Sequence, residues 1–526
     1  MKINLTLALI GILLSGISHG KALTVCTEAS PDGFDVVQYN SLTNTNAAAD
    51  TIFNRLLEYD ASSGKLVPSL AQQWQVSADG LQYTFKLRAK VAFQRTDYFQ
   101  PTRALNADDV IFSFQRMLDP NHPWHASAPN GYPHAQSFGL GKLVKDIRRI
   151  DDLTVQFTLQ QADATFLPLL SMGFASIYSA QYAAQLLATN QQNAFTSKPI
   201  GTGPFALRSF QKDAVIRFDA HPQYFGGKPK SDKLIYAITP DPVVRVQKVK
   251  AGECQIALGP KPQEITAAQQ DKNLKVLSTP MFATAFVALN TQHKPLDQVE
   301  VRQALKLAFD QKTYLNQVFQ GTATAANSPL PPATWSYLGD KDTSYNPGKA
   351  KALLAKAGFP NGFDTTIWIR PAGSTLNPNP RLGGELLQAD LAKIGVRAEL
   401  KTIEWGELIK RAKAGEHDIL FMGWSGDNGD PDNFLTPQFA CASLESGLNF
   451  ARYCQPQLDA LIKKGRTTAN ISERSKQYQA AQKIIAQQAL WIPLAHPLIS
   501  VITTPKVTGY IVNPFGRQNW LNVRSQ

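Results

Sequence analysis

Residues 423–434 read GWSGDNGDPDNF and place three aspartates, Asp427, Asp430 and Asp432, within six residues. Glycine, asparagine and proline separate them, which favours a tight turn. Such a stretch suits a metal loop, a catalytic carboxylate cluster, or a recess for a cationic ligand group. The preceding sequence predicts a strand, a helix that ends at Gly415, and a buried strand. The aspartates therefore follow the carboxyl end of a strand, where α/β proteins commonly bind ligands.

A calcium loop of the EF-hand type needs glycine at its sixth position and glutamate at its twelfth. Counting from Asp427 places Asp432 and Gln438 at these positions, and counting from Asp430 fails in the same way. The sequence therefore predicts no metal site in this stretch.

Catalytic motifs are also poorly matched. Ser425 lies in GWSGD, which lacks the second glycine of the GxSxG elbow. Ser209 begins SFQK, an S-x-x-K match, but the KTG and SDN partners of that motif are missing. His417 and His496 are isolated and are interpreted as structural histidines. An exported serine hydrolase is the disfavoured alternative, and we predict that the protein is not an enzyme.

Asp427 is the predicted ligand residue of the stretch. A half-buried carboxylate beside Trp424 is costly unless it is paired. It suits a primary ammonium group, and a charge-assisted hydrogen bond there would contribute roughly 1.5–3 kcal/mol. For Asp430 and Asp432 we predict a simpler role, the capping of a helix that begins near Pro431.

Length and composition restrict the class of protein. A chain of 526 residues predicts two or three domains. Hydrophobic content of 43% and charged content of 18% are typical of globular proteins. The formal charge is +12, but lysine and arginine are scattered and no nucleic-acid-binding motif occurs. We therefore interpret the charge as a basic, solvated surface and predict no nucleic-acid partner.

The first twenty residues have the composition of a secretory signal peptide. Lys2 precedes an apolar run from Leu5 to Leu14, and small residues follow up to Gly20. The run is too short for a membrane-spanning helix, and we predict cleavage after Gly20, with Ala22 as the second choice, and export of the mature chain.

Four cysteines remain after this cleavage, and an even number in an oxidising compartment predicts two disulfides. Four cysteines allow three pairings. Closeness in sequence favours Cys441 with Cys454, which would leave Cys26 with Cys254. A zinc site is the alternative, but no CxxC or histidine cluster accompanies the cysteines.

Several long motifs, in order along the mature chain, resemble the peptide-binding members of family 5 of the solute-binding proteins of ABC transporters. The chain is most similar to the periplasmic dipeptide-binding proteins of Gram-negative bacteria, and it is also similar to binding proteins for antimicrobial-peptide transport. The matching motifs are LNADDVIFSFQR (105–116), PIGTGPF (199–205), KPLDQVEVRQAL (294–305), YNPGKAKALLAKAG (345–358) and GWSGDNGDPDNF (423–434). All four cysteines also match, which implies the pairs Cys26–Cys254 and Cys441–Cys454.

The resemblance implies a two-lobed α/β fold of class II with an extra domain on the N-terminal lobe. It implies a signal peptide over 1–20 and three structural units. These are lobe I (21–52, 202–281 and 498–526), the extra domain (53–201) and lobe II (282–497). It implies a periplasmic monomer without cofactor, which captures a short peptide and delivers it to an inner-membrane ABC permease with its ATPase subunits.

The resemblance also implies how the peptide is held. Asp427 would bind the free α-amino group, strand edges at Ser41–Thr43 and Met422–Trp424 would bind the peptide backbone, and Trp424 would wall a side-chain pocket. The full set of predicted ligand-binding residues is Ser41, Leu42, Thr43, Arg370, Ser374, Met422, Gly423, Trp424, Ser425 and Asp427.

One position departs from the pattern of the dipeptide binders. An arginine that binds the peptide carboxylate is replaced here by Ser374. Arg370 lies four residues before it and Arg381 seven after it, and either is a candidate replacement. Relatives without this arginine include binders of haem, glutathione and cationic peptides. These ligands and longer peptides are therefore the alternatives to a dipeptide.

Overall fold

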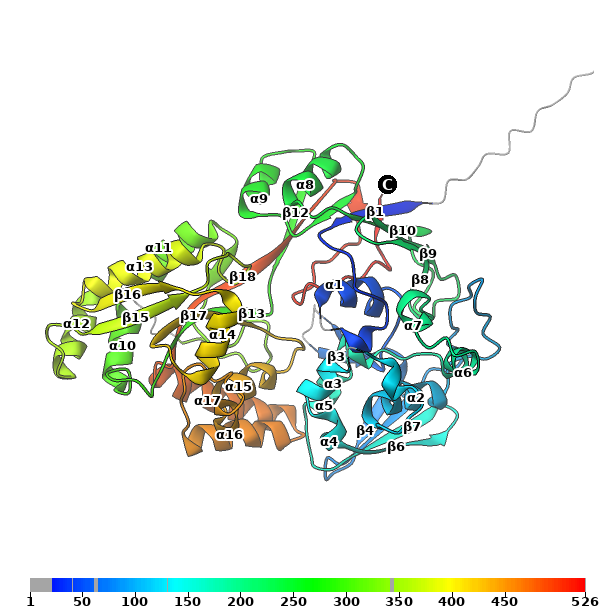
Figure 1. The fold of residues 1–526 in the computed structure, drawn as a ribbon, viewed down its shortest axis with the longest axis horizontal. Helices are drawn as coiled ribbons and strands as arrows, with labels where there is room; N and C mark the ends of the chain where they lie inside the picture. Colours follow the sequence, from blue (N-terminus) through cyan, green and yellow to red (C-terminus); the bar gives the residue numbers. More distant parts are fainter. Residues whose placement is uncertain (1–20, 40, 61–64, 130, 341–344, 526) are drawn as a thin grey trace, which may run out of the picture.

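The computed structural model describes residues 21–39, 41–60, 65–129, 131–340 and 345–525. The signal peptide predicted over residues 1–20 lies outside these residues. The fold is the predicted two-lobed α/β fold: Figure 1 shows one lobe with β13 and β15–β17 and a second lobe with β1 and β8–β10. No helix in the described part of the chain is long and apolar enough to cross a membrane.

Lobe I is built on strands β11-β1-β10-β9-β8, in this order. Strand β1 is parallel to β10 and β11, whereas β9 is antiparallel to both of its neighbours. The elements of this lobe are β1 (Ala22–Thr27), α1 (Leu42–Asn44), β8 (Phe205–Gln211), β9 (Val215–Ala220), β10 (Lys233–Ile238), α8 (Pro242–Lys250), β11 (Ile256–Leu258), α9 (Pro262–Gln269) and β12 (Lys275–Pro280), with β19 (Val507–Thr508) and β20 (Arg524–Ser525) near the C-terminus.

The predicted extra domain, residues 53–201, contains a separate antiparallel sheet in the order β4-β5-β7-β6. Its hydrophobic core continues without a break into that of lobe I. The elements are β2 (Leu57–Asp60), β3 (Lys65–Pro68), β4 (Ala71–Val76), β5 (Gln82–Leu87), α2 (Ala107–Leu118), α3 (Pro133–Ser137), α4 (Leu140–Leu143), β6 (Val144–Asp151), β7 (Thr154–Leu159), α5 (Phe166–Leu169), α6 (Ala180–Ala188) and α7 (Ala194–Ser197).

Lobe II carries strands β16-β15-β17-β13, and hydrophobic cores cover both faces of this part of the sheet. Its elements are β13 (Ala283–Leu289), α10 (Val299–Ala308), α11 (Gln311–Tyr314), β14 (Ala323–Ala325), α12 (Pro347–Lys356), β15 (Asp364–Ile369), α13 (Pro380–Ala392), β16 (Arg397–Thr402), α14 (Trp405–Ala414), β17 (Ile419–Ser425), α15 (Asp432–Phe439), α16 (Pro456–Thr467) and α17 (Ile471–Gln487).

One long strand, β18 (Trp491–Thr503), belongs to both lobes. Its first part, up to Ala495, pairs with β13 of lobe II, and its second part, from Leu498, pairs with β12 and β11 of lobe I. Figure 1 shows the strand running from one lobe to the other. The lobes are therefore joined through continuous backbone, and the partner change between Ala495 and Leu498 marks the crossing.

Local sequence signals explain many element boundaries. Asn106 begins α2 with a capping box in which Asp109 bonds back to the cap. Pro347 is the first residue of α12, and Gly358 follows the helix with a φ of +93°. Gly415 ends α14 at a φ of +82°, as its position after the amphipathic run predicts.

Both predicted disulfides are present. Cys26 in β1 is bonded to Cys254 before β11, with 5.9 Å between the Cα atoms, and Cys441 is bonded to Cys454, with 4.8 Å between them. The first bond joins residues 228 positions apart, and the second closes a short loop after α15. With all four cysteines paired, none is left to bind zinc.

Candidate functional site

The edge of β17 in lobe II is only partly covered. On one side β17 pairs with β13 along its whole length, from Ile419 to Ser425. On the other side β15 pairs with it only at Ile419 and Leu420, because β15 ends at Ile369. Residues 421–425 therefore have no strand partner on this side within the described part of the chain. Unpaired strand edges readily accept an extended peptide as a further strand.

Asp427 follows this open edge directly. The chain leaves β17 at Gly426, whose N–H donates to the carbonyl of Phe282 (2.8 Å). A Cβ atom at Gly426 would lie 2.6 Å from the ring of Phe282 and 2.7 Å from that of Phe434, so only glycine fits at this close approach. The backbone N–H of Asp427 then donates to Oδ1 of Asn433 (2.8 Å). These contacts fix the aspartate at the end of the edge.

The carboxylate of Asp427 has no internal counterion. Among the described residues, no lysine, arginine or histidine lies within ion-pair distance of it. The residue keeps an exposed surface, yet desolvation by the surrounding protein raises its pKa to about 6, against the opposing hydrogen bond from Asn433. A cation supplied by a ligand would stabilise the ionised form of this carboxylate.

The other two aspartates of the stretch, Asp430 and Asp432, form contacts within the protein. Asp430 forms a buried ion pair with Arg474 of α17 (2.8 Å), and its Oδ1 also accepts the N–H of Asp432 (3.0 Å). Asp432 accepts hydrogen bonds from the hydroxyls of Thr436 (2.7 Å) and Tyr478 (3.3 Å), and burial raises its pKa to about 6.

Helix α15 begins at Asp432, close to the predicted start near Pro431, and Asp430 does bond its first turn. The prediction that Asp432 also caps the helix is wrong, because its carboxylate bonds the hydroxyls of Thr436 and Tyr478 instead. The pairing of Asp430 with Arg474 was not predicted, because the arginine lies 44 residues further along the chain. Of the three aspartates, Asp427 alone is left for an external cation.

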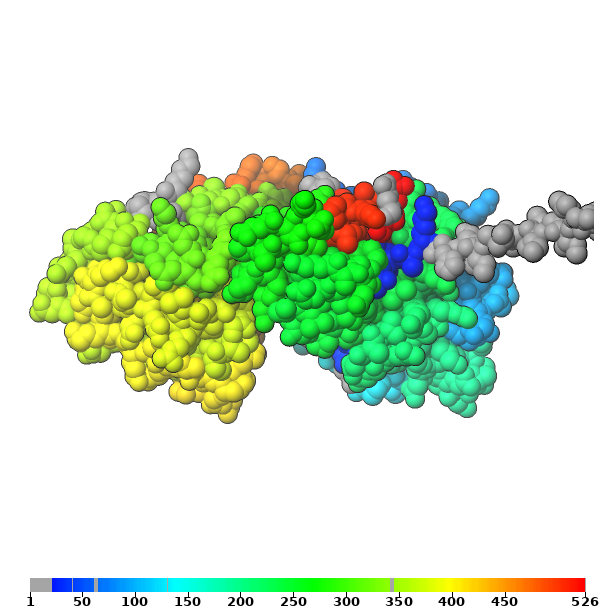
Figure 2. Space-filling model, turned by 90° about the horizontal axis from the view of Figure 1, so that it is seen from above, coloured from blue at the N-terminus to red at the C-terminus, as the bar shows by residue number. Residues whose placement is uncertain are grey.

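The loop after Asp427 also touches the extra domain. A Cβ atom at Gly429 would lie 1.7 Å from the ring of Tyr59 in β2, so the ring packs directly on the glycine backbone. Nearby, Arg466 of α16 pairs with Asp163 (2.9 Å) and its carbonyl accepts the N–H of Ala164 (2.8 Å). Besides the two chain connections, between β12 and β13 and along β18, lobe II therefore touches the extra domain at Gly429 and Tyr59. It also touches this domain between α16 and the segment before α5 (Figure 1). Figure 2 shows the surface deeply hollowed between the lobes.

Ser41–Thr43 do not form the predicted strand edge, and that prediction is wrong. Ser41 caps the short helix α1, and its hydroxyl oxygen accepts the N–H of Asn44 (3.2 Å). A serine cap satisfies a helix-start donor, which favours the helical turn over an extended segment. Leu42 is 46% exposed and its side chain lies against Gly516, while Thr43 is half-buried. Contact of these three residues with ligand stays a prediction.

The remaining predicted residues lie around β17 and the end of β15. Met422 and Trp424 pack against the core on the α14–α15 side of the sheet, and the indole N–H of Trp424 donates to the carbonyl of Asn433 (2.7 Å). A Cβ atom at Gly423 would lie 2.7 Å from Leu376, whose loop packs on the opposite face. Ser425 is the last residue of β17 and is half-buried.

Ser374, which stands where dipeptide binders have an arginine, and the two candidate replacements, Arg370 and Arg381, lie in different surroundings. Ser374 is used in a local turn, where its hydroxyl accepts the N–H of Asn377 (3.2 Å). Arg381 is 82% exposed and pairs with Glu385 (2.9 Å) on the outside of α13. Arg370 is half-buried at the end of β15, with its guanidinium 4.5 Å from the ring centre of Trp405.

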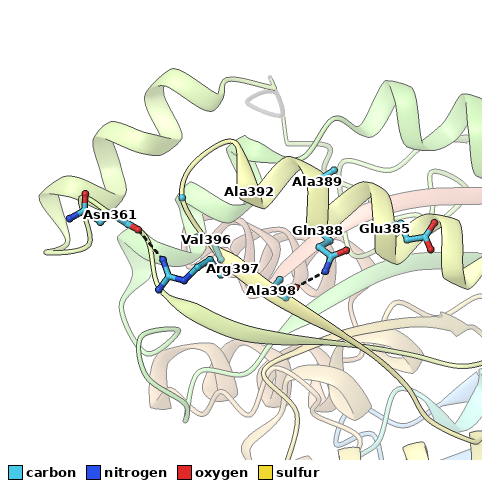
Figure 3. Close-up of a pocket in the computed structure, with 9 residues that line it drawn as sticks. Asn361, Glu385, Gln388, Ala389, Ala392, Val396, Arg397 and Ala398 are labelled. Carbon is cyan, nitrogen blue, oxygen red and sulfur yellow. Dashed lines mark hydrogen bonds between the residues drawn. The ribbon is translucent and has the colours of Figure 1, made fainter.

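A cavity of about 610 Å³ lies elsewhere, between α13, β16 and the turn at Asn361 (Figure 3). Its polar lining residues are Asn361, Glu385, Gln388 and Arg397. Arg397 donates to the carbonyl of Asn361 (3.3 Å), and Gln388 donates to that of Ala398 (2.7 Å). None of the predicted ligand-binding residues lines it, so it is separate from the open edge of β17.

Two α/β lobes joined by a shared strand, with an open strand edge that ends at an unpaired acid, define a two-lobed solute-binding protein of the peptide-binding class. The chain belongs to the bacterial extracellular solute-binding proteins, family 5, whose middle-region model matches residues 65–446. It is therefore a binding component of transport and not an enzyme.

Similar proteins match over nearly their whole length. The chain is 58% identical to "Probable di/tripeptide-binding protein 5" of Pseudomonas aeruginosa, over 98% of each chain. It is 43% identical to "Heme-binding protein A" of Haemophilus influenzae, over 95% of this chain and 91% of that protein. The solved structure of HbpA2 from Haemophilus parasuis superposes with a TM-score of 0.93 at 40% identity and covers 96% of this chain and 100% of that one.

Proposed function

We propose that the protein captures a short peptide of two or three residues with a free amino terminus and delivers it to an ABC permease. The observation that carries this proposal is the position of an unpaired carboxylate, Asp427, at the end of an unpaired strand edge. The name of the 58% identical relative, a di/tripeptide-binding protein, supports the same ligand class.

The position of Asp427 at one end of the edge supports one direction of the peptide. If its ammonium group pairs with Asp427, its backbone runs back along residues 425–421, antiparallel to β17. The main-chain groups of β17 then supply hydrogen bonds that do not depend on the ligand's side chains. The charge at the amino end is neutralised by Asp427, which fixes the register of the peptide on the edge.

Closure of the lobes would complete the site. We place the lobe boundaries at 281/282 and 497/498, where β12 gives way to β13 and where β18 changes partners. A ligand that touches both lobes stabilises the closed state, which the permease and its ATPase subunits then recognise. Cleavage after residue 20 and export to the periplasm agree with the two disulfides, which form in oxidising compartments.

The test is a calorimetric titration of ligand-stripped protein with Ala-Ala-Ala and with its N-acetylated form. We expect binding of the free peptide and at least tenfold weaker binding of the acetylated one, because acetylation removes the charge that pairs with Asp427. Titrations with haem and with glutathione run in parallel. Binding of either, with no binding of the peptide, would contradict the proposed function.

A further inference from the structure

The proposed function depends on an Asp427 carboxylate that is charged and held in place, and among the described residues no cation pairs with it. The polar side chain that meets this residue is Asn433, the second residue of α15. We infer that Asn433 is the positioning residue of the ammonium site and keeps the carboxylate of Asp427 both oriented and charged. This inference rests on the proposed function and adds the residue that prepares the site for its ligand.

The side-chain amide of Asn433 uses both of its ends on Asp427. Its Oδ1 accepts the main-chain N–H of Asp427 (2.8 Å). The other end of an amide is an NH₂ group, so the Nδ2 atom is left to donate. The carboxyl group of Asp427 accepts a hydrogen bond from this side chain, which lowers its pKa against the larger effect of burial. An ionised carboxylate has about four acceptor sites, so a ligand's ammonium group can bind beside the amide.

Asn433 is itself fixed through its main chain. Its N–H donates to the carbonyl of Asp430 (3.1 Å), and its carbonyl accepts the indole N–H of Trp424 (2.7 Å). Trp424 belongs to β17, so Asn433 is bonded both to the strand that carries the open edge and to the acid that follows that edge. The amide is therefore held at a fixed place relative to the edge.

The pairing of Asn433 with Asp427 also closes the base of the loop between β17 and α15. Beside it, a Cβ atom at Gly426 would lie 2.7 Å from the ring of Phe434, so the end of the strand and the start of the helix are in direct contact. Aspartate at position 433 could still accept the N–H of Asp427, but it would replace the NH₂ donor by a second negative charge. This exchange therefore separates the charge effect from closure of the loop.

Other titratable side chains near the loop do not take this role. On the elements packed around the loop they are Tyr59, Asp163, Asp430, Asp432, Arg466 and Arg474. The two arginines pair with Asp163 and Asp430, and burial raises the pKa of Tyr59 to about 12, so its phenol is neutral. Among the described residues, none of these groups contributes to the pKa of Asp427, which burial raises and the hydrogen bond from Asn433 lowers.

The experiment compares Asn433→Asp and Asn433→Ala with the parent protein. Asn346→Asp is the matched control, because the Oδ1 of Asn346 also accepts a main-chain N–H, that of Lys349 (2.9 Å), at the exposed start of α12. Each protein is titrated calorimetrically with Ala-Ala-Ala between pH 5 and pH 8. The amine of the peptide titrates alike in every series, so differences between the variants come from the protein.

Asn433→Asp should move the midpoint of the pH dependence upward by about one pH unit, because a second carboxylate beside Asp427 raises the apparent pKa of the pair. Its affinity should be about fivefold below that of the parent at pH 6 and should match or exceed it at pH 8. Asn433→Ala loses the acceptor and the donor together, so its affinity should be lower than that of the parent at every pH. Asn346→Asp should match the parent throughout.

A general loss of structure would lower the affinity equally at every pH and would not move the midpoint. The parent's midpoint in Asn433→Asp, or the parent's affinity in Asn433→Ala, would overturn the inference while the proposed function stands. If the parent binds Ala-Ala-Ala no better than its N-acetylated form, the proposed function fails and the inference fails with it.

Discussion

Asp427→Asn is expected to lower the affinity for a free-amine peptide at least a hundredfold. Asparagine keeps the shape and can still accept a hydrogen bond, but it removes the charge that pairs with the ammonium group. Removing one partner from a desolvated ion pair costs roughly 3–5 kcal/mol, because the other charge is left uncompensated. A hundredfold change in affinity corresponds to about 2.7 kcal/mol, which lies below this range, so a hundredfold loss is the smallest that we expect.

The same variant should remove a pH dependence. In the free protein the pKa of Asp427 is raised to about 6 by desolvation, and the bound ammonium group stabilises its ionised form. The affinity for the peptide should therefore be highest well above pH 6, where Asp427 is ionised. It should fall as the pH drops through this value, by up to tenfold per pH unit. With asparagine at this position the dependence should be flat.

The control is Asp364→Asn, which removes an exposed aspartate that pairs with Arg397 on the outside of lobe II. It should leave both the affinity and its pH dependence unchanged. Titration calorimetry between pH 5 and pH 8 measures both quantities. Undiminished affinity in Asp427→Asn would show that this carboxylate does not hold the ligand's amine.

The second large effect concerns stability. Replacing Cys26 and Cys254 by serine should lower the free energy of unfolding of lobe I by about 5 kcal/mol, because the disulfide closes a loop of 228 residues. Removal of the Cys441–Cys454 disulfide, with a separation of 13 residues, should cost about 3 kcal/mol. In the chain-entropy model the difference comes from the unfolded state, since a longer loop restricts more conformations.

Urea unfolding of the two double variants, followed by tryptophan fluorescence and circular dichroism, measures these costs. The variant without Cys441–Cys454 serves as the matched control, because it also replaces two cysteines and breaks one bond. An equal or larger loss from the short loop would contradict the assignment of the greater stabilisation to the long one.

Local signals made much of the fold predictable. The Asn106 capping box, the helix start at Pro347 and the helix stop at Gly415 all depend on residues within one turn of each other. Both disulfides followed from the spacing of four cysteines and from the resemblance to family 5. The place of Asp427 after a buried strand was predicted in the same way, since strand and turn are contiguous in the sequence.

Contacts between distant segments were not predictable from one sequence. The partner of Asp430 is Arg474, 44 positions away. Arg370 stacks on Trp405, which is 35 positions away and follows α13 and β16 in the sequence. The helical turn at Ser41 was missed for another reason. The strand edge at Ser41–Thr43 was an implication of the resemblance to family 5, and a serine cap followed by three helical residues is too short to show the helical periodicity that would have corrected it.

The most direct test of the account is a crystal structure of the protein with Ala-Ala-Ala bound. We expect the peptide to extend along residues 421–425, antiparallel to β17, with its ammonium nitrogen about 2.8 Å from the carboxylate of Asp427. A peptide bound in the reverse direction, or seated in the cavity between α13 and β16, would contradict the account.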